Sequence, residues 1–132
     1  MEHLVDLDAL AALLAAPVES WRLRATVGPL RWRDERAPWP PPIGTDRAGV
    51  VMPESLSIRV SREPDGELEI VVWTGGWADV DLLIGDDVVS RCPRFTDVDG
   101  ARTAVVRTVE RFLAARRVDR TPAEDGSVSR DR

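Results

Sequence analysis

The chain has 132 residues, which is the size of one ordinary domain and too short for two substantial hydrophobic cores. It carries 18 basic and 23 acidic residues, for a net charge of −5. The acidic excess lies in residues 54–93, where nine acidic residues and three arginines give a net charge of −6. Such a region repels nucleic-acid phosphates and attracts basic protein surfaces, so the charge distribution argues against DNA or RNA as a partner.

Cys92 and His3 are the only residues of their types. A single cysteine excludes a disulfide within the chain, and a single histidine near the N-terminus excludes a Ser-His-Asp triad and most catalytic zinc sites. We therefore expect no catalytic residue, no metal and no cofactor. Cys92 precedes Pro93 at a position predicted to face inward, which favours a buried structural thiol over a nucleophile.

No segment approaches the ~18 continuous apolar residues of a membrane-spanning helix. The N-terminal sequence MEHLVDLDALAALLAAP carries acidic residues where a signal peptide carries basic ones. These features predict a cytoplasmic protein that does not contact a membrane.

The first predicted element is a short amphipathic helix over residues 5–16. From Leu4 to Leu14, five leucines recur at helical spacing, and Pro17 is expected to end the helix because it has no backbone N–H. Next, SWRLRATV (20–27) alternates in the manner of a strand, with Trp21 on its apolar face. A Gly28-Pro29 turn would fold this strand onto a shorter one, residues 30–33, with Trp32 on the apolar face.

Residues 34–49 form a Pro-rich segment without periodicity, in which prolines cluster around Trp39. This composition predicts an extended connecting loop. Trp39 either packs against the body of the domain or anchors a partner protein, since tryptophan is enriched at interface anchors.

Four alternating segments follow, which predict an antiparallel meander with strands near residues 56–61, 68–73, 77–84 and 88–92. Short turns and the shared apolar face then select one register. That register pairs Leu68 with Val60, Val72 with Ala78, Ile84 with Val88, and Trp73 with Trp77 across the loop Thr74-Gly75-Gly76. It also aligns Arg59, Glu69, Asp81 and Arg91 in one row on the other face, which we call the outer face.

The last predicted element is a helix of about 20 residues. Thr96 and Asp99 resemble a capping box, an apolar stripe runs from Val98 to Leu113, and the helix is expected to end at Arg116-Arg117. Residues 118–132 have almost no apolar content and are predicted to be a disordered tail. The expected fold is α+β: one domain over residues 1–117, with an N-terminal helix, an antiparallel meander of four to six strands, and a C-terminal helix on one sheet face.

The outer face is the predicted binding site. It combines large apolar side chains with carboxylates, a composition typical of binding patches when nothing else covers it. The candidate residues are Trp73, Trp77, Leu83, Glu69, Asp79 and Asp81, together with Trp39 of the loop. The N-terminal helix or the loop around Trp39 could instead cover this face. Paired carboxylates can also serve acid–base catalysis or a hard metal ion, but acids that alternate along a strand are more typical of a solvated face.

The sequence also resembles known proteins in outline. The N-terminal AAPV, the meander VVWTGGWADVDLLIGDDVV and the closing TDVDGARTAVVRTVERFL resemble small single-domain proteins of actinobacterial type. In size, acidity and layout the chain is similar to the immunity proteins of bacterial polymorphic toxin systems. This resemblance implies a non-enzymatic protein that binds and neutralises a cognate toxin, and it assigns no residue a role. The acidic outer face adds the expectation that the partner surface is basic.

Two other hypotheses stay open from the sequence. The first is a small-molecule-binding module or accessory enzyme of secondary metabolism, with a pocket between the sheet and the Pro-rich loop lined by Trp32, Trp39 and Trp73. The second is a structural protein that pairs through its sheet into a homodimer. The sequence does not choose between a monomer and a homodimer.

Overall fold

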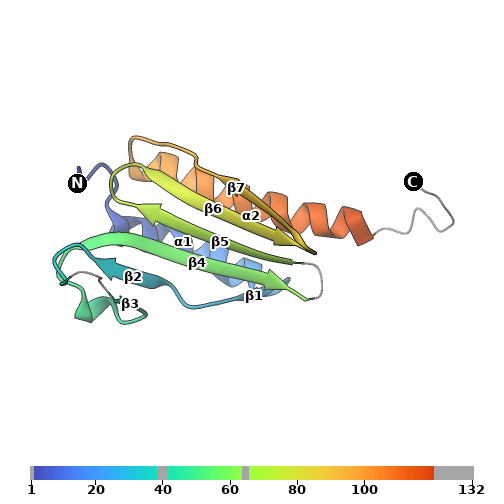
Figure 1. The fold of residues 1–132 in the computed structure, drawn as a ribbon, viewed down its shortest axis with the longest axis horizontal. Helices are drawn as coiled ribbons and strands as arrows, with labels where there is room; N and C mark the ends of the chain where they lie inside the picture. Colours follow the sequence, from blue (N-terminus) through green and yellow to red (C-terminus); the bar gives the residue numbers. More distant parts are fainter. Residues whose placement is uncertain (1, 39–41, 64–65, 121–132) are drawn as a thin grey trace, which may run out of the picture.

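The computed structural model describes residues 2–38, 42–63 and 66–120, with side chains up to residue 114. The predicted α+β fold is confirmed: two helices lie on one face of an antiparallel sheet, which has seven strands in the described part of the chain (Figure 1). The strand order is β3-β2-β4-β5-β6-β7, and β1 also pairs with β4. The elements are α1 (Leu7–Trp21), β1 (Thr26–Val27), β2 (Arg31–Asp34), β3 (Ile43–Gly44), the 3-10 helix η1 (Arg47–Gly49), β4 (Pro53–Arg62), β5 (Gly66–Trp73), β6 (Trp77–Ile84), β7 (Asp87–Arg91) and α2 (Val98–Arg120).

Helix α1 is longer than the sequence predicted. It begins after Asp6, whose carboxylate accepts a hydrogen bond from the Ala9 N–H at 3.1 Å, and it continues through Pro17 to Trp21. The expectation that Pro17 ends the helix was wrong. An interior proline costs about 3 kcal/mol, and this cost is offset by the buried stripe that continues past it, formed by Leu7, Leu10, Leu14, Val18 and Trp21.

The predicted hairpin between residues 20–27 and 30–33 does not form. Only Thr26–Val27 of the first segment is a strand, because Trp21 belongs to α1. Strands β1 and β2 both pair with β4, and between them the Gly28 N–H donates to the Arg59 carbonyl at 2.9 Å. The chain therefore runs along the edge of β4 instead of reversing at Gly28-Pro29. Trp32 is buried in the core, in agreement with its predicted place on the apolar face.

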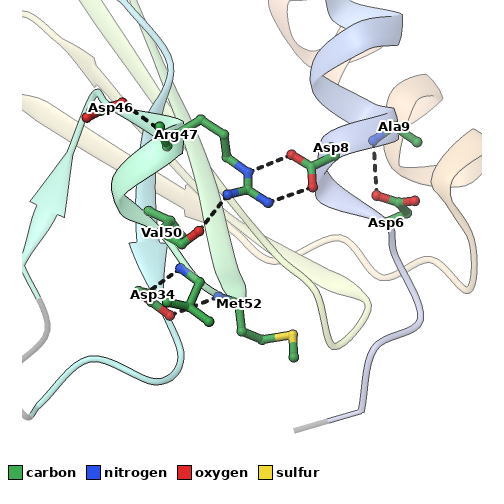
Figure 2. Close-up of polar contacts among 10 residues, drawn as sticks. Asp6, Asp8, Ala9, Asp34, Asp46, Arg47, Val50 and Met52 are labelled. Atoms are coloured by element: carbon green, nitrogen blue, oxygen red, sulfur yellow. Dashed lines mark hydrogen bonds and ion pairs between the residues drawn. The ribbon is translucent and has the colours of Figure 1, made fainter.

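The crossover from β2 to β4 is held by two charged residues (Figure 2). Asp34 accepts hydrogen bonds from the N–H groups of Val51, Arg36 and Met52, which hold the pKa of its carboxyl below its ordinary value. Arg47 of η1 donates to both carboxylate oxygens of Asp8 in α1, at 2.6 and 2.8 Å, and lies over the Trp32 ring. The crossover is thereby fixed to the N-terminal turn of α1.

The hydrophobic core lies between the helices and the inward face of the sheet. Helix α2 contributes its predicted stripe, including Ala101, Val105 and Leu113, and α1 packs beside α2 with Trp21 fully buried. The start of α2 differs from the prediction. The Asp97 carboxylate, not the Thr96 hydroxyl, caps the helix by accepting from the Gly100 N–H at 2.7 Å.

The C-terminal limit of α2 also differs from the prediction. The helix continues to Arg120, beyond the expected end at Arg116-Arg117, so residues 118–120 of the predicted tail belong to it. The other residues of that tail, 121–132, lie outside the described residues.

Candidate protein-binding face

The outer face of the sheet is formed by the odd-numbered residues of β4, β5 and β6. Both helices lie on the opposite side, so no helix of the described chain covers this face (Figure 1). The alternative that the N-terminal helix covers it was therefore wrong, because α1 packs beside α2. Trp39, the other candidate cover, lies outside the described residues.

Two stacked tryptophans occupy one end of the outer face. Trp73 and Trp77 are directly opposite in the register, as predicted, and their ring centroids are 6.0 Å apart with an interplanar angle of 19°. The Trp73 Nε1–H donates to the Asp79 carboxylate at 2.9 Å, and the Arg33 guanidinium lies 5.5 Å from the Trp73 ring centroid. Both tryptophans are half-buried, so each presents part of its ring to solvent.

The loop between the tryptophans is held in place by the start of the chain. The N–H groups of Leu4 and Val5 donate to the Thr74 carbonyl at 2.9 and 3.0 Å, and the buried Thr74 hydroxyl donates to the Val5 carbonyl at 2.8 Å. Gly76 has φ of 105°, a conformation that favours glycine. The tryptophan pair is thus fixed before any partner binds.

The acidic residues of the outer face differ in their ion pairing between β5 and β6. Glu69 lies 3.3 Å from Arg59 of β4 and 3.8 Å from Arg31 of β2, and Glu67 lies 3.2 Å from Arg59. Asp79 and Asp81 of β6 contact only neutral donors among the described residues, the Trp73 indole and the Ser90 hydroxyl. Among the described residues of this face, the carboxylates of β6 beside the tryptophans are therefore the ones that form no ion pair with an arginine.

The predicted register is confirmed from β4 to β6 and wrong at β7. Leu68 pairs with Val60 and Val72 with Ala78, but Ile84 pairs with Asp87 instead of Val88. The turn contains only Gly85 and Asp86, with Gly85 at φ of 60°, so it is one residue shorter than predicted. A shift of one residue moves every side chain of a strand to the other face.

The shift at β7 changes three predicted positions. Ser90, not Arg91, lies opposite Asp81, and its hydroxyl donates to the Asp81 carboxylate at 2.6 Å, while Arg91 lies opposite the inward-facing Val80. Cys92 is exposed, so the expected buried thiol was also wrong. Val88 joins Leu83 on the outer face, with exposed fractions of 66% and 42%. The sequence placed Leu83 there and missed Val88.

The structure also bears on the predicted small-molecule pocket, on metal binding and on membrane contact. Trp32 and Trp73 lie on opposite faces of the sheet, so they do not line the common pocket that the sequence predicted. In the described part of the chain, no group of three or more His, Cys, Asp or Glu side chains is placed to hold a metal ion. No helix among the described residues is long and apolar enough to span a membrane.

Comparisons with known proteins give no match: no family model matches the chain, and no curated protein and no solved structure is significantly similar to it.

Proposed function

We propose that the chain is a non-enzymatic protein-binding module that docks a basic protein surface on its outer face. The observation that carries this proposal is the position of Asp79 and Asp81, which form no ion pair with any described arginine, beside the stacked Trp73 and Trp77. Tryptophans are frequent anchors of protein interfaces, and unbalanced charge accelerates association with an oppositely charged partner. Leu83 and Val88 extend the apolar part of the same face.

The proposed partner class is a toxin domain that the chain neutralises by binding. The similarity of this chain to immunity proteins in size, acidity and layout supports this class. A basic toxin domain would place cationic groups against Asp79 and Asp81 and would cover Trp77, which excludes water from the contact. The first partner to test is a toxin encoded beside this gene.

The test measures binding to that toxin domain as a purified protein. Trp77→Ala removes one ring of the stacked pair, and we expect the dissociation constant to rise at least about 30-fold, the effect of losing an interface anchor worth about 2 kcal/mol. Asp79→Asn with Asp81→Asn should lower the association rate and reduce its dependence on salt concentration. Titration calorimetry and stopped-flow fluorescence measure the two effects.

The control also neutralises two carboxylates, but on the helical side of the molecule. Glu19 and Asp99 are exposed residues of the two helices, and Glu19→Gln with Asp99→Asn should leave both constants unchanged. All variants must keep the far-UV circular dichroism of the unmodified chain. Equal affinity of the Trp77→Ala variant and the unmodified chain would refute the assignment of this face.

A further inference from the structure

Strand β7 is an exposed edge of the sheet. All five of its residues are exposed, including Val88 at 66% and Val89 at 39%, and no strand of the described chain pairs with its far side. The opposite edge, β3, has only two residues. Proteins usually shorten, twist or cover such edges, because the unpaired backbone N–H and C=O groups can hydrogen-bond to a strand of another chain. An edge this long, with exposed valines on both faces, indicates a partner strand.

The backbone of β7 fixes which residues would bond to that strand. The Ala78 N–H donates to the Pro93 carbonyl and the Phe95 N–H to the Gly76 carbonyl, each at 3.0 Å. In antiparallel pairs, hydrogen-bonded and non-hydrogen-bonded positions alternate. The backbone groups of Asp87, Val89 and Arg91 therefore face β6, whereas those of Val88 and Ser90 face the free edge.

A second copy of β7 fits this edge in one register. The residues of the second copy whose backbone groups face the free edge are also Val88 and Ser90. They must lie opposite Val88 and Ser90 of the first copy, which leaves three central alignments. In the first alignment Val88 lies opposite Val88 of the other copy, and Asp87 then lies opposite Val89. In the second, Ser90 lies opposite Ser90 of the other copy, and Arg91 then lies opposite Val89. With Val88 opposite Ser90, Asp87 of each copy lies opposite Arg91 of the other, and the two Val89 residues meet on the dyad. This last register alone pairs the charges, and it pairs them twice.

The inward side of β7 supports the same alignment. A groove of about 230 Å³ lies between the β5–β7 side of the sheet and α2, lined by apolar residues and by Arg91, Thr108 and Arg111, with no acidic residue in its lining. Val89 is part of its wall. Neither Asp87 nor Arg91 has an ion-pair partner among the described side chains. Asp87 of a second copy would bring the missing carboxylate to the arginine end of this groove.

We propose that two copies of this chain associate through antiparallel pairing of β7 with β7, with Val89 on the dyad. The two sheets then form one continuous sheet, whose outer faces lie on the same side. The dimer leaves Trp73, Trp77 and Asp79 uncovered, so it carries two copies of the candidate binding face. This inference does not depend on the nature of any partner of that face.

Charge reversal tests the pairing on the full chain. Light scattering coupled to size exclusion should give a mass of twice 14.6 kDa for the unmodified protein at neutral pH. Asp87→Arg alone and Arg91→Asp alone place like charges opposite each other, and each should shift the protein to the monomer. The double variant restores both opposite-charge pairs and should restore the dimer. Arg102→Asp, on the exposed surface of α2, is the matched control and should stay dimeric.

Two further variants test the edge and the register. Ser90→Pro removes an N–H that faces outward, so the chain should fold with unchanged circular dichroism and become monomeric.

In a Cys92→Ser background, Val89→Cys should form a disulfide-linked dimer under mild oxidation, because non-hydrogen-bonded pairs bring side chains close. Val88→Cys should not, because Val88 faces Ser90. A monomeric unmodified protein at all concentrations, a dimer that resists single charge reversal, or crosslinking through Val88→Cys would each overturn the proposal.

Discussion

Gly76 is the residue on which the geometry of the tryptophan pair depends most. A Cβ atom at this position would lie 2.7 Å from the Phe95 carbonyl oxygen and 3.0 Å from Leu4 Cδ1. The close approach exists because the Phe95 N–H donates to the Gly76 carbonyl, which joins the loop to the segment before α2. No side chain fits between these backbones, and φ of 105° is itself unfavourable for other residues.

Gly76→Ala should therefore destabilise the protein more than Gly85→Ala. Gly85 also has a positive φ, of 60°, but a Cβ atom there would meet nothing within 4 Å. Alanine at Gly85 adds only backbone strain, about 1–2 kcal/mol. At Gly76 the carbonyl of Phe95 must also move, so we expect a loss of at least about 2–4 kcal/mol. Urea unfolding of the two variants measures the difference, and equal losses would contradict the argument.

At the scale of elements, α1 shows how packing overrides local preference. Its C-terminal turn follows Pro17 and carries the fully buried Trp21, whose Nε1–H donates to the Glu110 carboxylate of α2 at 2.8 Å. Without this turn, Val18 and Trp21 would leave the core. The burial of two such side chains stabilises the fold by about 3–6 kcal/mol, which equals or exceeds the cost of the proline.

Pro17→Ala should consequently stabilise the protein. Alanine restores a backbone N–H inside the helix and removes the contact between the proline ring and the carbonyl of Leu13. We expect the free energy of unfolding to rise by about 1–3 kcal/mol, the upper value being the full propensity difference between the two residues. Ala16→Pro, one position earlier, should be strongly destabilising. Chemical denaturation of the two variants checks both signs, and a neutral Pro17→Ala would show that the helix is not strained there.

The contact between α1 and α2 should also make stability depend on pH. The Arg24 guanidinium and then the Trp21 N–H hydrogen-bond to Glu110 and hold the pKa of its carboxyl below the ordinary value of 4.5. A lowered pKa means that the contribution is complete above pH 4.5 and is lost as pH falls through the folded-state pKa. Because both side chains are partly exposed, this contribution is at most about 1 kcal/mol.

Glu110→Gln provides the measurement for that contribution. The free energy of unfolding of the unmodified protein, minus that of this variant, should be constant above about pH 5.5 and shrink as the pH falls below 4.5. Because all other carboxyls are common to both proteins, their titration cancels in the difference. A difference that stays constant down to pH 3 would mean that the Glu110 contact does not depend on its charge.

The elements that could be predicted are those whose patterns depend on their immediate neighbours. Strands β4, β5 and β6 each carry an apolar residue at every second position and are joined by short turns, so their register and the positions of Trp73, Trp77 and Asp79 followed from the sequence. SWRLRATV misled because an alternating segment of eight residues also fits the last turn of a helix followed by a short strand. Its role is decided by the core that Trp21 enters, which is not local information.

The position of β7 and the exposure of the site could not be predicted for different reasons. A turn of two residues and a turn of three are both compatible with Gly85-Asp86-Asp87, and one residue reverses the faces of Val88, Ser90 and Arg91. Whether α1 covers the outer face depends on the side of the sheet to which the chain crosses after Trp21. That choice is made by the packing of α1 against α2, and nothing in either helix sequence specifies it alone.

At the scale of the molecule, one core joins every layer. Buried residues of α1, of the sheet and of α2 form a single cluster, and the crossover is attached to α1 through Asp8 and Arg47. Each helix buries its apolar side chains against the sheet and against the other helix. The outer face, by contrast, contributes few fully buried side chains, so its residues can change with less effect on folding.

This arrangement predicts a single cooperative unfolding transition. The far-UV circular dichroism of α1 and α2 and the fluorescence of the buried Trp21 and Trp32 should change at the same urea concentration, because removing either helix exposes the core under the other. A Trp39→Phe, Trp73→Phe, Trp77→Phe variant removes the other three tryptophans, so the fluorescence reports only on Trp21 and Trp32. The measurements belong in the Ser90→Pro background, in which subunit association would not add a concentration-dependent step. If the helical signal were lost before the tryptophan signal, α1 would be a peripheral element and the burial of Trp21 would not couple it to the sheet.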